Sequence, residues 1–276
     1  MTGAGEAAPP VDRALLDLAV AVAREAGEVT LRWFGARDLA VEAKADGTPV
    51  TAADRTAERL VRERLAAAAP DDGVLGEEEP ETPGRSGRRW IVDPIDGTKG
   101  FARGVPLYTT LLALDDEHGP AVGVIAIPAQ GQVVAAGRGL GCWWDGAPAR
   151  VSDVPDLDGA YLMSSSYSHW PAEHLLAVQD AGCVLRTWGD GYGYALVATG
   201  RAEAMVDHEV ARYDVAAMPV ILAEAGGRFT SLAGEPGAQH GSGVASNGLV
   251  HDALLARLRS SGGTGASGTA ETPSRT

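Results

Sequence analysis

The strongest constraint on this chain is an apolar strand that ends in two carboxylates. The segment Trp90–Gly100 reads WIVDPIDGTKG, so Asp93 follows three apolar residues and Asp96 stands three positions further on. Carboxylates held this close repel each other and raise each other's pKa, unless a hard cation such as Mg²⁺, which prefers oxygen ligands, lies between them. The alternative is a turn at the end of a strand in which both aspartates cap a helix.

The residues around this segment add an anion-binding turn and more acid. Gly97 lets the backbone approach a ligand closely, and the amides of Gly97 and Thr98 could hold phosphate if a helix begins there. Upstream, Gly76–Pro80 reads GEEEP directly after the apolar pair Val74 and Leu75. Taken alone, such a run of glutamates is usually a solvated face.

The overall charge also favours a bound cation. The chain of 276 residues has a formal net charge of −14 and no run rich in lysine or arginine, which argues against nucleic acid or an anionic membrane as a partner. A protein this acidic would repel a phosphorylated substrate unless divalent cations reversed the local sign of charge.

The composition is that of a cytoplasmic globular protein. With 45% hydrophobic residues the chain can bury a large core, and no segment approaches the roughly 20 uninterrupted apolar residues that a membrane span needs. The start of the sequence lacks a basic and then apolar leader. Cys142 and Cys183 show no metal-binding spacing, so we expect two reduced, buried thiols.

Hydrophobic periodicity predicts a mixture of helices and strands. Apolar residues recur every three or four positions from Asp12 to Trp33, and further helices are expected at Thr51–Ala69 and Tyr194–Thr199. Short apolar runs predict strands at 90–92, 107–114, 122–127, 133–136, 161–163, 183–185 and 202–206.

The C-terminal part continues this alternation and then becomes polar. A helix after Asp214 should end at Gly226, with Pro219 bending its second turn. Residues 1–11 and the tail 259–276 are expected to be disordered. Between them we expect an N-terminal α+β half at 12–150, which carries the acidic motifs, and a C-terminal α/β half at 151–258, in a layered α+β or αβαβα arrangement.

Three motifs, in this order, resemble the inositol monophosphatase superfamily: GEEE at 76–79, WIVDPIDGTKGF at 90–101 and YDVAAMPVILAEAGGRF at 213–229. The resemblance implies an α+β fold, a layered αβαβα sandwich of the inositol monophosphatase and fructose-1,6-bisphosphatase type. It also implies hydrolysis of a small phosphate monoester by in-line attack of water, with two or three Mg²⁺ ions as cofactors. A homodimer and inhibition by lithium are further expectations from the resemblance.

The resemblance assigns metal ligands residue by residue. It implies that Glu77 is shared between metals and that Asp93, Asp96 and the carbonyl oxygen of Ile95 are the central ligands. Asp214 would complete the cage from the start of a distant helix.

The resemblance also assigns catalytic roles. Thr98, together with the shared glutamate, would orient the attacking water, and Glu78 would support a more weakly held ion. The segment at 44–54 reads KADGTPVTAAD and resembles the family's lysine followed by a VTxxD turn, which places Asp54 behind Thr98. Thr51 and Asp54 also have the spacing of a capping box, so Asp54 could simply start a helix, and both roles can hold together.

The substrate is less constrained than the metal site. The string WGDGYGYALVATGRAE at 188–203 resembles the histidinol-phosphate phosphatase branch more than the inositol branch. Substrate contacts are expected from Gly97, Thr98, Asp190 and Asp207. The last of these falls where the family places an acid that touches the substrate, and it could accept a hydrogen bond from an inositol hydroxyl or from the ammonium of histidinol.

Departures from the family pattern leave other substrates open. Tyr213 stands where the family generally has tryptophan, and His208 where histidinol-type members often have proline. Histidinol phosphate is the favoured substrate, and the alternatives are inositol monophosphate or a sugar or nucleoside monophosphate of a specialised biosynthetic pathway. A catalytically silent binding protein is a remote alternative, and it should lack a metal ligand. A bisphosphatase would need a second cationic pocket, for which the candidates are Arg103, Arg186, Arg201 and Arg212.

Overall fold

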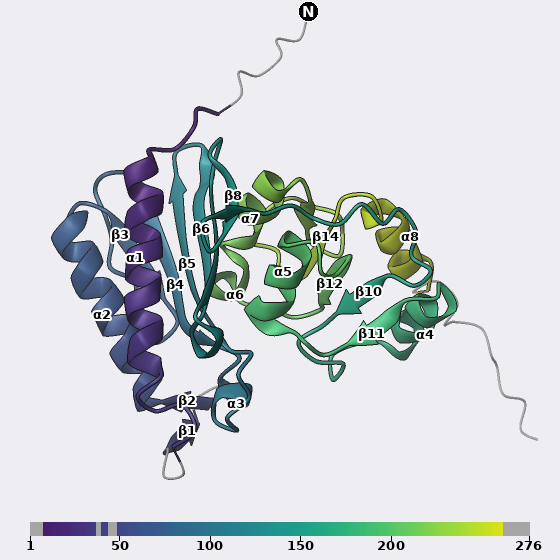
Figure 1. Cartoon of the computed structure of the whole chain (residues 1–276), viewed down its shortest axis with the longest axis horizontal. Coiled ribbons are helices and arrows are strands. Elements are labelled where there is room, and N and C mark those ends of the chain that lie inside the picture. The colour runs from purple at the N-terminus through teal and green to yellow at the C-terminus, as the bar shows by residue number, and fades with distance from the viewer. Residues whose placement is uncertain (1–7, 37–39, 44–48, 262–276) are drawn as a thin grey trace, which may run out of the picture.

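The computed structural model describes residues 8–36, 40–43 and 49–261, and these residues form five stacked layers of helices and sheets (Figure 1). Two N-terminal helices cover one face of a seven-stranded sheet, and shorter helices fill the middle. A five-stranded sheet follows, with two more helices on its far side. The predicted α+β class and the αβαβα layering are therefore confirmed.

The first layer consists of α1 (Arg13–Thr30) and α2 (Ala52–Ala68). The side chain of Asp12 caps α1 by accepting a hydrogen bond from a backbone amide of its first turn. At α2 the side chain of Thr51 accepts from the helix backbone while the carboxylate of Asp54 accepts from the Thr51 amide. Both predicted helices are confirmed, and so is the predicted capping box.

The second layer is a mixed sheet in the order β3-β4-β5-β6-β7-β8-β9. β3 and β4 are parallel, and every later pair of neighbours is antiparallel. Trp90 and Val92 of β4 pack under α1 and α2, while Ile91 faces the middle layer, so this strand is buried on both faces. The strands are β3 (Gly73–Gly76), β4 (Arg89–Asp96), β5 (Thr109–Asp116), β6 (Gly119–Ile127), β7 (Gln132–Gly137), β8 (Gly141–Trp144) and β9 (Ala147–Pro148).

The middle layer corrects one prediction. Asp214 does not begin one long helix that Pro219 bends, because the chain forms two helices here. Pro219 lies in the first turn of the second of them, where the amide that proline lacks would have no partner within the helix. The helices of this layer are α5 (Asp190–Ala198), α6 (Arg212–Val215) and α7 (Met218–Ala225).

The fourth layer is a five-stranded sheet in the order β11-β10-β12-β14-β13. β10 is parallel to β11 and β12, whereas β14 is antiparallel to β12 and β13. Met205 faces the middle layer, and Val206 on the same strand packs toward the outer helices α4 and α8. The elements are β10 (Tyr161–Met163), β11 (Val184–Arg186), β12 (Ala204–Asp207), β13 (Arg228–Thr230), β14 (Gly243–Ser246), α4 (Ala172–Asp180) and α8 (His251–Ser261).

A short helix after β4 is fixed by packed aromatic rings. The ring of Phe101 in α3 (Thr98–Phe101) meets that of Tyr108 edge-on, with centroids 4.8 Å apart, and Phe34 contacts both rings. The Tyr108 hydroxyl and the Thr30 hydroxyl of α1 are hydrogen-bonded at 2.8 Å. The end of β4 is thereby tied to the first helical layer. The remaining elements are β1 (Val41–Ala43), β2 (Pro49–Thr51) and the 3₁₀ helix η1 (Pro128–Gln130).

The described ends of the chain are more ordered than the sequence suggested. Residues 8–11 lie within the expected disordered start, yet Val11 is buried and its amide donates to the carbonyl of Arg138. At the other end α8 runs through Ser261, beyond the expected boundary at 258. The rest of both expected disordered segments, residues 1–7 and 262–276, lies outside the described residues.

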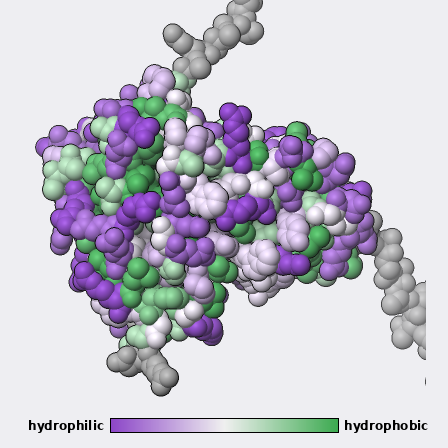
Figure 2. All heavy atoms as spheres, in the orientation of Figure 1, coloured by the Kyte–Doolittle hydropathy of each residue, from purple (hydrophilic) through white to green (hydrophobic). Residues whose placement is uncertain are grey.

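The two cysteines are buried and free, as the sequence predicted. Hydrophilic residues are interspersed with smaller hydrophobic areas on the face shown in Figure 2. In the described ranges, no helix has the length and apolar character needed to cross a membrane. Cys142 and Cys183 are buried and free, and burial raises their thiol pKa values to about 12 and about 11.

Acid is expected to destabilise the fold through His251. This buried ring bonds Thr230 and Ser246, and burial lowers its pKa from 6.5 to about 4. As the pH falls, the unfolded chain takes up a proton on this histidine before the folded chain does. The free energy of unfolding is therefore highest above pH 6.5 and falls by on the order of 3 kcal/mol as the pH approaches about 4. Urea unfolding between pH 7 and pH 4 should show that the free energy of unfolding falls more steeply with pH for wild type than for His251→Gln. Parallel curves would contradict this assignment.

Candidate metal centre

Strand register brings Glu77 beside Asp93. β3 and β4 run parallel with Gly76 opposite Val92, so the next residues along the two strands are Glu77 and Asp93. The carboxyl of Glu77 lies close enough to that of Asp93 to raise its pKa. Neighbouring strands lie only about 4.8 Å apart, which explains why two acids that are distant in sequence meet here.

Asp96 and Asp214 complete the cluster from two further directions. The register of β4 against β5 shifts between Asp93 and Asp96, which turns the second carboxylate toward the first. Asp214 arrives from α6, where its carboxylate accepts from the Ala211 amide at 2.7 Å. Ligand oxygens of Asp93, Asp96 and Asp214 all lie within 4.8 Å of one another.

The electrostatics of this cluster call for a cation. Burial, followed by the charges of Glu77, Asp96 and Asp214, raises the pKa of Asp93 well above its ordinary value of 3.8. Burial and then the charge of Asp190 raise the pKa of Asp96, and burial raises that of Asp214 to about 7. Such shifts mean that the negative charges are poorly compensated by the protein itself.

The donor set fits Mg²⁺. Asp96 accepts hydrogen bonds from the Gly191 amide and the Thr109 hydroxyl, and Asp214 accepts from a backbone amide. None of these donors carries a positive charge. A buried group of carboxylate oxygens with little neutralisation is what hard divalent cations prefer, and it offers no nitrogen or sulfur ligand that would favour zinc or copper.

The turn after Asp96 has the geometry expected of it. Gly97 adopts a left-handed φ of 88°, and the four-residue helix α3 begins at Thr98, a start that the sequence had left open. A Cβ atom on Gly97 would lie 2.8 Å from Oδ2 of Asp190, so glycine is needed here for space as well as for conformation. The Thr98 hydroxyl donates to the carbonyl of Ile95 at 3.0 Å, which places these two predicted site residues in direct contact.

Asp54 lies at the start of α2 but does not bond Thr98. Its Oδ2 accepts from the amide and the hydroxyl of Thr51 at 2.8 and 2.6 Å. Its Oδ1 is buried without a hydrogen-bond partner in the described part of the chain. The hydroxyl of Thr98 donates to Ile95 instead, whereas the predicted cap is present. The lysine expected to precede this turn, Lys44, lies outside the described residues.

The loop that carries Glu77 and Glu78 is held by a residue that the sequence did not single out. Glu58 of α2 is fully buried, and its carboxylate accepts from the amides of Glu78 and Glu79 at 2.7 and 3.1 Å. A glutamate in the middle of a helix carries no motif that marks this role, so only the packing of α2 against the loop shows it.

On the other side of the cluster, Asp207 faces inward rather than toward open space. Its oxygens accept from the amide and the hydroxyl of Ser165 at 2.9 and 3.0 Å and from the Tyr194 hydroxyl at 3.0 Å. Burial raises its pKa. Asp190, the other predicted substrate acid, lies against Gly97, and burial together with the charge of Asp207 raises its pKa to about 6.

Ser165 links these two acids, and sequence analysis missed it. Its hydroxyl donates to Asp207 and accepts from the amide of Asp190 at 2.9 Å. The backbone also packs closely here, since a Cβ atom on Gly189 would lie 2.2 Å from Cα of Ser165. The serine follows β10 in a run of three serines whose spacing resembles no motif, so no sequence signal was available.

All four arginines considered for a second phosphate pocket contact other groups. Arg186 lies over the rings of Tyr161 and Trp188, and Arg201 lies 3.7 Å from the centroid of the Trp144 ring. Arg212 bonds Asp115 at 2.6 Å, and Arg103 donates to a backbone carbonyl of its own turn. These contacts do not favour a bisphosphatase.

His208 lies outside the acidic cluster. Its Nε2 and the Nδ1 of His174 are hydrogen-bonded at 2.8 Å, and its ring packs against Trp170 with centroids 4.5 Å apart. His208 follows directly after β12, and its contacts with Trp170 and with His174 of α4 place it on the outer-helix side, whereas Asp207 bonds Tyr194 of the middle layer. Burial lowers its pKa to about 4.

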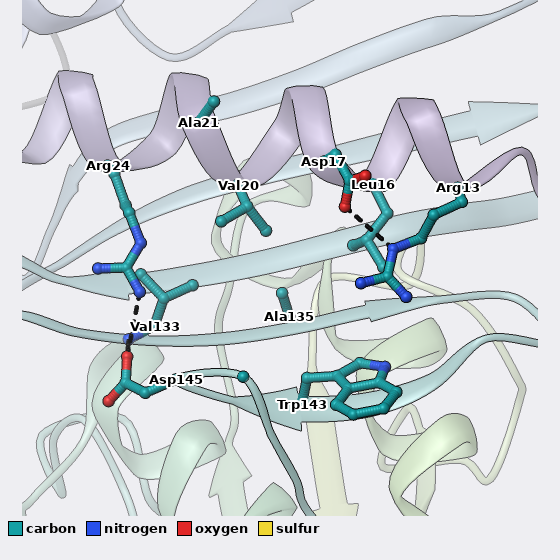
Figure 3. A pocket seen from close by; sticks show the side chains of 11 residues that line it. Arg13, Leu16, Asp17, Val20, Ala21, Arg24, Val133, Ala135, Trp143 and Asp145 are labelled. Carbon is teal, nitrogen blue, oxygen red and sulfur yellow. Dashed lines mark hydrogen bonds and ion pairs between the residues drawn. The ribbon is translucent and has the colours of Figure 1, made fainter.

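A separate cavity of about 310 Å³ lies between α1 and the strands β7 and β8 (Figure 3). Val20, Val133 and Trp143 form part of its apolar lining, and the ion pair of Arg24 and Asp145 lies at one end. It shares no residue with the acidic cluster. It is therefore not the candidate active site.

Known proteins resemble this chain over nearly its whole length. A histidinol-phosphatase of Mycobacterium tuberculosis is 46% identical over 252 residues, covering 88% of this chain and 97% of the relative. One of Chlorobaculum parvum is 44% identical and covers 88% and 96% of the two chains. The solved structure of the extragenic suppressor protein suhB from Bartonella henselae has a TM-score of 0.83 at 28% identity and covers 92% of this chain and 100% of its own.

The family assignment rests on a sequence model of a protein family as well as on these relatives. The model of the inositol monophosphatase family matches residues 12–263, which include every strand and helix named above. The chain belongs to the inositol monophosphatase family.

Proposed function

We propose that this chain is a Mg²⁺-dependent phosphatase of small phosphate monoesters and that histidinol phosphate is its substrate. The observation that carries the proposal is the convergence of Asp93, Asp96 and Asp214 in a largely buried site, where the hydrogen-bond donors to Asp96 and Asp214 among the described residues carry no positive charge. Relatives named histidinol-phosphatase, which match 88% of this chain, support the choice of substrate.

The ligands proposed for two or three Mg²⁺ ions are the three aspartates, Glu77 and the carbonyl oxygen of Ile95. When bound, the ions would polarise the phosphate and lower the pKa of the attacking water. All five donors come from three separate stretches of the chain that the fold brings to the ends of β3, β4 and α6.

The remaining site residues would position the reactants. Thr98 and Glu77 would orient the water, and the left-handed turn at Gly97 would let the phosphate approach the backbone. Asp54 and Glu78 would support this arrangement from behind. Holding the water and the phosphate in line removes much of the entropic cost of the reaction.

An acidic leaving-group side favours a cationic alcohol. Asp190 lies beside Gly97 and is near Asp207, so two acidic side chains lie next to the proposed phosphate position, with Lys99 as the nearby cation. Histidinol carries an ammonium group, whereas inositol offers only neutral hydroxyls. Charge complementarity therefore supports histidinol phosphate over inositol phosphate.

Phosphate release from histidinol phosphate, inositol 1-phosphate and several sugar and nucleoside phosphates, at equal concentration with Mg²⁺, tests this proposal. Faster turnover of another monoester would contradict the choice of histidinol phosphate as substrate but would still support phosphatase activity. No release from any of them would favour the silent binding protein.

Asp190→Asn is expected to distinguish charge recognition from general damage. Its kcat/KM for histidinol phosphate should fall about 10-fold or more, as for loss of a hydrogen bond to a charged group. Its kcat/KM for inositol 1-phosphate should change less than about 3-fold, because inositol has no ammonium group that could pair with Asp190. The exposed Glu173→Gln, which changes net charge equally, is the control. Equal losses for both substrates would contradict ammonium recognition by Asp190.

Further expectations from the family belong to the proposal as well. They are a homodimeric assembly, inhibition by lithium and a cytoplasmic location, with a small phosphorylated metabolite rather than nucleic acid or a membrane as partner. Each is open to direct measurement by light scattering, inhibition kinetics or fractionation.

A further inference from the structure

Two side chains of α2 hold the backbone of the acidic loop from behind. Glu58 is fully buried, and its two carboxylate oxygens accept from the amides of Glu78 and Glu79. Arg62, one helical turn further on, donates from Nε to Glu58 at 2.9 Å. We call Glu58 and Arg62 the loop latch.

Arg62 also forms hydrogen bonds with the loop itself. Its Nη2 donates to the carbonyl of Glu79 at 3.0 Å, and its Nη1 donates to the hydroxyl of Thr82 at 3.0 Å. Its side chain is only 13% exposed. One guanidinium group therefore binds α2 and both ends of the 79–82 turn in a fixed geometry.

The carboxylate of Glu58 also packs closely against the backbone of Gly76, at the start of the loop. A Cβ atom on Gly76 would lie 2.1 Å from Oε1 of Glu58, so the glycine before the glutamates is needed for the approach of the carboxylate. Glu77 lies between this glycine and the gripped amide of Glu78. Its backbone is thus held on both sides.

The latch acts on the one proposed ligand that β4 and α6 do not carry. Asp93, Asp96 and Asp214 are placed by those two elements, whereas Glu77 follows the end of the four-residue edge strand β3. Glu77 and Asp93 repel each other, which is one reason why the pKa of Asp93 is raised, so holding Glu77 beside Asp93 costs free energy. A loop at the edge of a sheet would relax away from such repulsion unless something held it.

We propose that Glu58 and Arg62 are positioning residues that set the affinity of the site for divalent cations by fixing the backbone of Glu77. The inference rests on the proposed function, since it assumes that Glu77 is a metal ligand. Partners behind metal ligands commonly change metal affinity by about 10-fold to 100-fold when removed. The latch would act on affinity rather than on chemistry once the metal is bound.

The test is calorimetric titration of the full chain with MgCl₂ alone, without substrate. Glu58→Gln keeps the shape of the side chain, but its amide nitrogen cannot accept, so at least one loop amide loses its partner. The Kd for Mg²⁺ should rise about 10-fold or more, while kcat at saturating Mg²⁺ stays within about 2-fold. Arg62→Gln, which is nearer the surface, should raise the Kd in the same direction and serves if Glu58→Gln does not fold.

Arg59→Gln is the matched control. Arg59 lies on the same helix and bonds the side chain of Glu79 at 3.0 Å, but it is 64% exposed and its bond goes to a side chain rather than to the loop backbone. Its Kd for Mg²⁺ should equal that of wild type. Folded latch variants that bind Mg²⁺ like wild type would overturn the inference and leave the metal centre intact. A wild-type protein that binds no Mg²⁺ would overturn the proposed function itself.

Discussion

Asp93→Asn is expected to abolish turnover and, at the same time, to make the metal-free protein more stable to heat. Asp93 is 1% exposed and lies among Glu77, Asp96 and Asp214, whose charges raise its pKa. Asparagine keeps the volume but removes one of the repelling charges, so the fold should gain stability without metal. In a chain of this size about 1 kcal/mol shifts Tm by about 2–4 °C, which is readily measured in the presence of a chelator.

The loss of activity should be large because one ligand of a charge-stabilising site is removed. Single electrostatic stabilisers of a transition state are worth about 100-fold to 1,000-fold in kcat, or ~2.7–4 kcal/mol, and a metal ligand should cost at least as much. Phosphate release and thermal unfolding of the same preparation measure both effects. The exposed Asp156→Asn is the control and should change neither. An active variant, or one with a lower Tm without metal, would contradict the assignment of Asp93.

Removal of divalent cations should silence the wild-type enzyme reversibly. Dialysis against a chelator is expected to lower phosphate release to background, and added Mg²⁺ should restore it, because the proposed chemistry depends on the metal. Mg²⁺ should also raise Tm, since a ligand at 100 times its Kd stabilises the native state by about 2.7 kcal/mol. Relief of repulsion among the buried carboxylates would add to the same shift.

KCl at matched ionic strength separates specific binding from screening. Salt screens exposed charges well but buried charges poorly, so KCl should neither restore activity nor raise Tm to the same extent. Asp93→Asn should lose most of the Mg²⁺-dependent rise in Tm. Equal rises with KCl and MgCl₂ would show that no cation site exists in this cluster.

The sequence predicted the parts of the site that are local. An apolar run that ends in DPID specifies a strand followed by a turn with two carboxylates, and the structure shows β4 ending at Asp96 with α3 starting at Thr98. Thr51 and Asp54 form the capping box that their spacing indicated. Such features depend on neighbouring residues and on backbone sterics, so they can be read from a short stretch of chain.

The long-range contacts were accessible only by resemblance. Nothing in the spacing of Glu77, Asp93 and Asp214 shows that they meet; the resemblance supplied this, and the parallel register of β3 and β4 and the position of α6 give the reason. The prediction of one helix bent at Pro219 was wrong because the sequence alone does not show where a new helix starts.

The sequence by itself determined the family, the layered fold and the identity of the acidic residues. Only the tertiary structure decided that Asp207 faces Ser165 and Tyr194, that Thr98 bonds Ile95 rather than Asp54, and that Glu58 grips the loop behind Glu77. The physical reason is that a buried polar group must find a partner, and which partner is in reach depends on how distant segments pack.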